Sequence, residues 1–503
     1  MGAIWRWALA ETVTVVPPSE ESRAGFRALM RNRNYALLWT GQLVSEMGNR
    51  FHWIAVSLWI YSLTGSAASV SLAVSSMFAG GLLVSLWAGV LVDRFDRRRI
   101  LVTADLVRAG LVLAIPTLIQ TNIWFVYLDL VLISVATAFF RPAIFAVVPI
   151  TVPRHSLLAA NSLFSAMDTG TEMAGPLLAG ILAEAFGYSS LLYVDAGTYV
   201  FSSLCIAFMT LRSSFPYGTG RLSLISLRRG VAEGLQYIRR DTFQWGLFIL
   251  IFPATLVGAG LNALQTPLAK GAVGITDSQF GTFNSVWGIG FLAASLLLGW
   301  YGSIVRRGTL ILSGYFLGFI ATGLMGLSRG FQHLLLAGFV VGFSNTMYYV
   351  GLGTALMEHT PSALIGRVIS TRQLALGTVR VVSPLFFGAL AEWIGIRAAI
   401  MMMAVIGALG TTAVVLWLPS VRRLGGDTQT ARSPGIWRWT IGRIDPEIEH
   451  MRQHRMNGAS LISAIVVLVV LVYRVGSSVL ALVIVIAMLT YLGALARRRW
   501  GVR

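Results

Sequence analysis

Long apolar blocks recur along this chain, and they restrict its fold more than any other feature of the sequence. Residues 69–92, 101–119 and 124–150 are examples. A helix needs about 20 predominantly apolar residues to cross roughly 30 Å of hydrocarbon, and only helices and closed barrels satisfy every backbone polar group in lipid. Because the blocks lack the two-residue alternation of barrel strands, they predict an all-α membrane protein.

The composition supports a membrane protein and excludes several other classes. Of the 503 residues, 56% are apolar and only 12% are charged, whereas a soluble domain carries about 25% charge. The net charge of +18 does not indicate nucleic-acid binding, because the arginines form short clusters between apolar blocks and not one basic face. Cys205 is the only cysteine, which excludes a disulfide framework and a cysteine metal site.

The sequence lacks the motifs of common enzyme and cofactor classes. It contains no Walker loop, no His-Glu-x-x-His pair and no nucleophile elbow, which are signatures of ATP binding, zinc hydrolysis and serine hydrolysis. We therefore expect no catalytic residues, no metal site and no cofactor, and we expect that the chain is not an enzyme.

Twelve membrane spans are predicted, in two groups of six. The first group occupies residues 34–211 and the second occupies residues 243–419. The expected spans are 36–63, 69–92, 100–119, 123–150, 157–186 and 190–211, then 243–268, 278–301, 309–328, 332–357, 367–393 and 397–419. Between the groups, residues 212–242 form a polar connector, in which residues 227–240 have the pattern of an amphipathic helix on the membrane surface.

Basic residues predict the orientation of these spans. Every second connection contains arginine, several of them in clusters, while the connections between them carry at most one basic residue. Because basic loops remain in the cytoplasm, we expect residues 1–33, the connector and residues 420–458 on the cytoplasmic side of a bacterial cell membrane. Residues 459–496 form a C-terminal apolar extension, which is either one further helix or a helical hairpin.

An internal repeat relates the two groups of spans. Residues 174–187 align with residues 382–395 at an offset of 208, and the pairs share proline, glutamate and two glycines. The shared residues include Pro176 with Pro384, Gly180 with Gly388, and Glu184 with Glu392. A duplicated six-helix half is typical of transporters, which bind substrate between the halves near the membrane midplane.

A charged motif follows the second span. It comprises Gly89, Asp93, Arg94, Arg97 and Arg98. Here a glycine allows close helix approach, a carboxylate can cap a neighbouring helix N-terminus, and arginines can pair with acids or phosphates. The equivalent loop of the second half has Ser303 in place of the acid. The pattern resembles the loop signature of the major facilitator superfamily and predicts a conformational latch.

Further segments resemble the macrolide-efflux and siderophore-exporter branches of that superfamily. They are Asn34-Tyr35 with Leu38-Trp39 and Gly41-Gln42, then residues 104–109, and residues 138–143. The resemblance covers roughly residues 30–420. It implies the major facilitator fold, with twelve transmembrane helices in two pseudo-symmetric halves, and a monomer that moves a small molecule across the lipid bilayer.

The fifth span resembles, in part, the glycine-proline motif associated with antiporters. The matching residues are Gly170, Gly175, Pro176 and Gly180. Glycines permit tight helix packing and proline permits bending. The alternative is ordinary helix packing, which uses the same small residues.

Ionisable residues within the spans are the candidates for function, because charge in the bilayer is costly. Asp168 and Glu172 lie one turn apart, and with Glu46 they are candidates for binding the transported proton. The alternatives are a structural ion pair or side chains that reach toward the membrane surface. At the offset of 208, Glu172 corresponds to Arg380. The candidates for lining a cavity are Arg141, Arg380, Asn262, Asn345 and Tyr348.

The predicted function is efflux of a small, drug-like organic molecule by a secondary active transporter that exchanges it for protons through alternating access. One alternative is a uniporter or exporter of a metabolite, siderophore or lipid. A second alternative is a membrane scaffold or sensor that transports nothing, although a scaffold has no need of charged residues inside the membrane.

Overall fold

The computed structural model describes residues 26–210, 224–301, 307–361, 364–418 and 421. All regular secondary structure in these ranges is helical. The short helix α1 (Phe26–Arg31) precedes a first bundle of six long helices. They are α2 (Arg33–Thr64), α3 (Ala67–Arg94), α4 (Arg97–Thr121), α5 (Ile123–Thr151), α6 (Leu157–Phe186) and α7 (Tyr188–Ala207), with a short 3-10 turn η2 (Arg154–Ser156) before α6.

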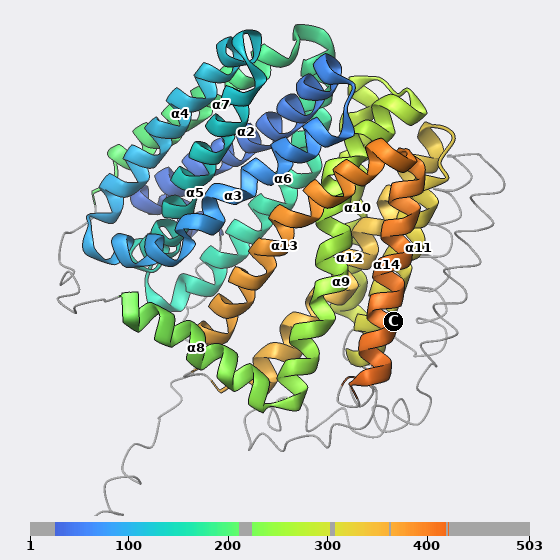
Figure 1. The fold of residues 1–503 in the computed structure, drawn as a ribbon. Helices are drawn as coiled ribbons and strands as arrows, with labels where there is room; N and C mark the ends of the chain where they lie inside the picture. Colours follow the sequence, from blue (N-terminus) through green and yellow to red (C-terminus); the bar gives the residue numbers. More distant parts are fainter. Residues whose placement is uncertain (1–25, 211–223, 302–306, 362–363, 419–420, 422–503) are drawn as a thin grey trace, which may run out of the picture.

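The second bundle also has six long helices, and it follows a helix that lies across one end of the molecule (Figure 1). The crossing helix is α8 (Leu224–Arg240), which begins three residues before the predicted amphipathic helix. The bundle consists of α9 (Thr242–Thr266), which continues into the π-helical turn η3 (Pro267–Val273), then α10 (Asp277–Tyr301), α11 (Arg307–Gly326), α12 (Phe331–His359), α13 (Ile365–Ile394) and α14 (Ile396–Trp417). The C-terminal extension at 459–496 lies outside the described residues.

Side-chain caps begin several of these helices. Asn32 accepts hydrogen bonds from the backbone at the start of α2, Asp96 does so at the start of α4, and Asp241 does so at the start of α9. Such caps satisfy amide groups that have no partner within the helix. At the C-terminal ends of the equivalent helices α6 and α13, Gly187 and Gly395 have positive φ values of 77° and 86°. Glycine adopts this conformation without steric cost.

Ten described helices are long and apolar enough to cross a membrane. The two other long helices, α2 and α6, have 32 and 30 residues. They carry Glu46, Arg50, Asp168 and Glu172 in their interiors. Both helices contribute charged residues to the site described below.

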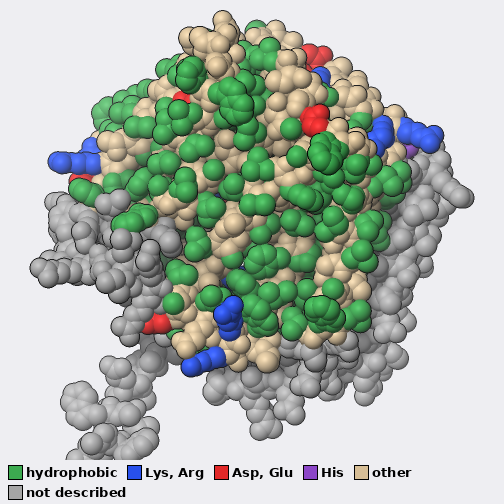
Figure 2. Space-filling model, in the orientation of Figure 1, with side chains coloured by type: hydrophobic (Ala, Val, Ile, Leu, Met, Phe, Trp, Pro, Cys, Tyr) green, Lys and Arg blue, Asp and Glu red, His purple; other side chains and the backbone are tan. Residues whose placement is uncertain are grey.

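The outer surface of the bundles is apolar. Figure 2 shows one face that is covered mainly by hydrophobic side chains, with the few charged side chains lying toward its edges. Leu158 is 80% exposed and Trp393 is 89% exposed. A soluble monomer seldom exposes so much contiguous apolar surface, so this face fits a lipid environment.

The two bundles pack against each other mainly through two helix pairs, α3 with α13 and α6 with α10. At the second crossing, a Cβ atom at Gly180 would lie 2.5 Å from the Asp277 carbonyl oxygen and 2.8 Å from the Gly281 Cα. At the first crossing, a Cβ atom at Gly388 would overlap the Ser71 side chain. Glycine therefore sets the close approach of the helices at equivalent positions of both halves.

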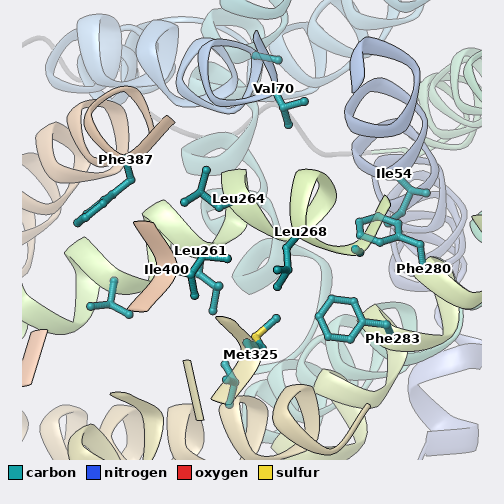
Figure 3. Packing of buried hydrophobic residues seen from close by; sticks show 14 of the residues in the cluster. Ile54, Val70, Leu261, Leu264, Leu268, Phe280, Phe283, Met325, Phe387 and Ile400 are labelled. Carbon is teal, nitrogen blue, oxygen red and sulfur yellow. The ribbon is translucent and has the colours of Figure 1, made fainter. Parts of the chain in front are cut away.

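Buried side chains from both halves complete this interface. Figure 3 shows Ile54 and Val70 of the first bundle near Leu264, Leu268 and Phe280 of the second, all in one hydrophobic cluster. Each of these five side chains is at most 1% exposed. The contact between the halves is therefore packed like a protein interior.

Candidate functional site

A cavity of about 1150 Å³ lies between the two bundles. Its walls come from α2, α3, α5, α6 and α7 of the first bundle, from α9, α10 and α13 of the second, and from α8. Val231 of α8 and Gly366 and Arg367 at the start of α13 are among the lining residues. The cavity therefore extends to the end of the molecule where α8 lies.

The opposite end of the molecule is closed by contacts between the halves. The Glu392 carboxylate of α13 accepts hydrogen bonds from the Ser66 hydroxyl at 2.6 Å and the Ala68 amide at 3.0 Å. The Glu184 carboxylate of α6 accepts one from the Ser278 amide at 2.8 Å. Both carboxylates thus lie at a helix N-terminus of the other half, where backbone amides and the helix dipole favour negative charge.

A second set of polar contacts lies at the same closed end. The Asp277 carboxylate accepts a hydrogen bond from the Tyr188 hydroxyl of the other half at 2.9 Å, and it pairs with Lys270 at 2.7 Å. Closure at this end therefore combines tight glycine crossings with polar contacts between the halves.

Both signs of charge face the cavity. The charged lining residues are Glu46, Arg50, Arg141, Glu172, Arg367 and Arg380. The acids come from α2 and α6 of the first half, and Arg380 comes from α13 of the second. Aromatic side chains line the same space and include Trp53, Phe78 and Trp287. Such a surface can hold a molecule that has both apolar and ionised parts.

The structure brings most of the predicted cavity residues together. Arg141, Asn262 and Arg380 line the cavity, as do Glu46 and Glu172. Asp168 lies one turn before Glu172 and interacts electrostatically with the charged groups around it.

Two predicted residues lie elsewhere in the second half. Asn345 and Tyr348 of α12 are absent from the cavity lining formed by the described residues. The Tyr348 ring packs on the Tyr315 ring of α11, with 4.6 Å between the ring centroids. The sequence did not show which face of α12 turns toward the neighbouring helix.

The glycine-proline segment of α6 lies where α6 meets other helices. A Cβ atom at Gly175 would lie 2.6 Å from the Arg50 Cβ of α2. The absence of a side chain at Gly175 therefore allows the Arg50 side chain to lie against α6 at the cavity wall. Pro176 lines the cavity. Gly180 forms the crossing with α10, whereas a Cβ atom at Gly170 would have no described neighbour within 4 Å.

The predicted latch motif spans the turn between α3 and α4. Gly89, Asp93 and Arg94 lie in the last turns of α3. Arg97 begins α4, and Arg98 donates a hydrogen bond to the Ala207 carbonyl at the end of α7. This contact lies within the first half.

A cluster of ionisable side chains was missed by the sequence analysis. His52 lies on α2, Asp129 on α5 and Asp195 on α7, and each is at most 8% exposed. The signal was present, because Asp129 and Asp195 interrupt apolar blocks. Only the tertiary structure shows that His52 lies beside them.

Two six-helix bundles around a cavity, closed at one end and set in an apolar surface, define a membrane transport protein. A family model described as the Major Facilitator Superfamily matches residues 38–269 and 247–502. The chain belongs to the Major Facilitator Superfamily. Its second match extends through the C-terminal region, which the sequence resemblance did not include.

Relatives in this family include bacterial efflux proteins. The chain is 28% identical over 344 residues to Macrolide efflux protein A of Streptococcus pyogenes, covering 66% of this chain and 83% of the relative. It is 25% identical over 379 residues to a multi-drug resistance efflux pump homolog of Lactococcus lactis, covering 73% and 90%. The chain is thus a transporter close to the efflux branch of the superfamily, in a bacterial cell membrane, and not an enzyme.

Solved structures with the same fold are also transporters. A bacterial homolog of the human lysosomal transporter Spinster, in an inward-facing and unoccupied conformation, superposes with a TM-score of 0.61 at 14% identity, covering 79% of this chain and 99% of the other. A POT family transporter in complex with 5-aminolevulinic acid gives a TM-score of 0.61 at 14% identity, covering 80% and 99%. Similarity at this level of identity establishes the fold.

Proposed function

We propose that the chain exports a macrolide or a similar drug-like molecule from the cytoplasm in exchange for protons, by alternating access. The observation that carries this proposal is the cavity between the halves, which reaches the α8 end and is closed at the opposite end. A transporter that captures its substrate from one side requires such an asymmetric path.

The size and chemistry of the cavity support a large organic substrate. Its volume of about 1150 Å³ exceeds the roughly 300–1,000 Å³ of most drug-sized ligand pockets. The wall combines aromatic surface with a few ionised groups. The names of relatives among macrolide and multidrug efflux proteins point to the same substrate class.

The direction of transport follows from the proposed topology. Arg239 and Arg240 end α8, and Arg367 lies beside the same end of the cavity. Because basic residues gather on the cytoplasmic side, we assign this end to the cytoplasm. Single cysteines in residues 212–242 should be labelled only after the membrane is permeabilised; labelling from outside intact cells would reverse the orientation.

Proton exchange is assigned to acids of the first half. Glu172 is the first candidate, because it lines the cavity and lies one turn before the bend-permitting Pro176; Asp168 and Glu46 are the alternatives. A carboxyl group that moves between an apolar and a watery environment changes its proton affinity. A carboxyl group can therefore bind a proton when the cavity opens to one side of the membrane and release it when the cavity opens to the other.

The test uses purified protein in proteoliposomes, with radiolabelled erythromycin as the probe. An imposed proton gradient should drive uphill movement of the probe, and a protonophore should abolish it. Protein-free liposomes provide the background. Equal probe movement with and without the gradient would reject proton exchange and favour a uniporter, and absence of movement under every condition would reject the macrolide class.

A further inference from the structure

A buried group of ionisable side chains lies in the first half, outside the set of cavity acids assigned above. It joins four helices through His52 of α2, Asp105 and Arg108 of α4, Asp129 of α5 and Asp195 of α7. Asp105 and Asp195 have no exposed surface, and Arg108 is 2% exposed. Only His52 among these five residues lines the cavity.

The imidazole of His52 faces the carboxylate of Asp195. Its Nδ1 atom lies 3.3 Å from Asp195 Oδ2. A Cβ atom at Gly48, one turn before His52, would overlap the side chains of Asp195 and Thr198. The glycine therefore makes room for α7 to bring its carboxylate against α2. The Thr198 hydroxyl contacts the other oxygen, Asp195 Oδ1, at 3.4 Å.

Asp129 of α5 interacts electrostatically with the same imidazole. It is 4% exposed. Its Oδ2 atom has no hydrogen-bond partner among the described residues. A buried carboxylate oxygen with no partner is costly in the ionised state, and a bound proton removes that cost.

The charges of the cluster do not balance without an additional proton. Arg108 pairs with Asp105, and its guanidinium lies 4.1 Å and 4.4 Å from the ring centroids of Phe140 and Tyr199. A protonated His52 can neutralise either Asp129 or Asp195, but not both. Helix α3 supplies no titratable residue between 67 and 92, so no other positive charge is available from that side.

We propose that His52, Asp129 and Asp195 form a proton-binding site in the wall of the cavity. This inference rests on the proposed proton exchange and adds a second, buried site to the cavity acids. His52 contacts Asp195, interacts electrostatically with Asp129 and lines the cavity, so it can pass a proton between the cavity water and the buried oxygens.

A polar contact connects this site with the acids in the cavity. The Tyr199 hydroxyl donates a hydrogen bond to Asn49 Oδ1 of α2, and both residues line the cavity. Tyr199 lies one turn after Asp195 on α7, and Asn49 lies three residues before His52 on α2. This hydrogen bond therefore links α2 and α7 next to the buried site and at the cavity wall.

The experiment compares Asp129→Asn and His52→Gln with wild type in two assays with labelled erythromycin. The first measures transport driven by a proton gradient, and the second measures the affinity of the detergent-purified protein between pH 5.5 and 8.5. If erythromycin displaces the proton from this site, wild-type affinity should rise with pH, by up to about tenfold per pH unit for one proton. Both variants should lose most gradient-driven transport, and Asp129→Asn should flatten the affinity profile.

Controls separate this site from other causes. Ser203→Ala alters a buried position on the same helix as Asp195 without removing a titratable group, so it should behave as wild type. Size-exclusion profiles should show that both test variants remain folded.

The outcomes also separate the two proposals. If wild type and both test variants keep the same gradient dependence and the same pH profile, while Glu172→Gln loses them, the buried site is rejected and proton exchange stands. If wild type itself shows no dependence on pH or on the gradient, both proposals fail together.

Discussion

The two halves of the transporter use the same packing positions. Gly180 and Gly388 make equivalent helix crossings against the opposite half. Four residues further along each helix, Glu184 and Glu392 accept hydrogen bonds from the helix N-terminus that they meet. These features belong to the repeated segment, so duplication reproduced the parts that hold the halves together.

The interiors of the two halves carry different charges. In the first half, the described helices hold six acids away from their ends: Glu46, Asp105, Asp129, Asp168, Glu172 and Asp195. In the second half, the acids of the described helices lie near helix ends: Asp277, Glu358 and Glu392. Both halves place arginines inside their helices, and the second half does so with Arg372 and Arg380 of α13. The comparison indicates that the scaffold is symmetric, whereas the proposed proton chemistry belongs to the first half.

The largest expected effect tests this division directly. Glu172→Gln should abolish gradient-driven erythromycin transport while sparing exchange at equal pH, because the amide has a similar volume but cannot release a proton. Arg380→Gln, at the equivalent position of the second half, should keep its dependence on the gradient even if its rate falls. Proteoliposome transport with and without the gradient measures both. Loss of the gradient dependence in Arg380→Gln alone would place the coupling in the second half.

A second test compares the two loops that contain the latch motif and its counterpart. Asp93→Asn should reduce transport about tenfold or more with the protein still folded in the membrane, because it removes a charge that can pair with basic groups and a helix terminus. Ser303→Ala in the second half should have less than a twofold effect. Transport is normalised to the amount of protein that elutes as a single species. Equal transport activity in both variants would show that the first loop sets the orientation of the spans and does not act as a latch.

A smaller effect is expected at the helix crossing between the halves. Gly180→Ala places a methyl group against the backbone of α10, and overpacking of this kind costs about 1–3 kcal/mol. Gly170→Ala, on the same helix, enters open space and should be neutral or stabilising by up to about 1 kcal/mol. The midpoint temperature of thermal unfolding in detergent and the transport rate should both be lower in Gly180→Ala, and neither should be lower in Gly170→Ala. Equal unfolding temperatures and transport rates in the two variants would show that α6 and α10 can shift to accommodate the added methyl group.

The smallest effect concerns the capping carboxylates at the closed end. Glu184→Gln and Glu392→Gln each weaken an interaction between a charge and a helix terminus, worth about 0.3–1 kcal/mol, so each should shift the closed-to-open ratio by up to about fivefold. The rate at which an impermeant maleimide modifies a cysteine at the buried position Ala67 reports opening. Similar increases in both variants are expected from the symmetry of the packing. An increase in only one would show that the two closures are unequal.

The sequence predicted the helices well and their inward-facing residues less well. The helix bounds agree with the predicted spans within a few residues, except that α7 ends at Ala207 and η3 extends the first helix of the second half to Val273. Charge inside the apolar blocks marked Glu46, Glu172, Arg141 and Arg380, which line the cavity. Asn345 was selected as a neutral polar residue and Tyr348 as an aromatic residue, and residue type does not specify which face of a helix turns inward.

The sequence by itself determined the class of protein. Apolar blocks of membrane-spanning length leave the helix as the structure that satisfies the backbone in lipid, and the repeat with its loop motif indicated the superfamily. The tertiary structure decided which ionisable groups meet. His52, Asp129 and Asp195 come from three separate helices, and their proximity depends on helix rotation and on the close packing at Gly48. Rotation and packing are set by side chains from many helices at once, so local sequence patterns can mark Asp129 and Asp195 as unusual but cannot show that they meet His52.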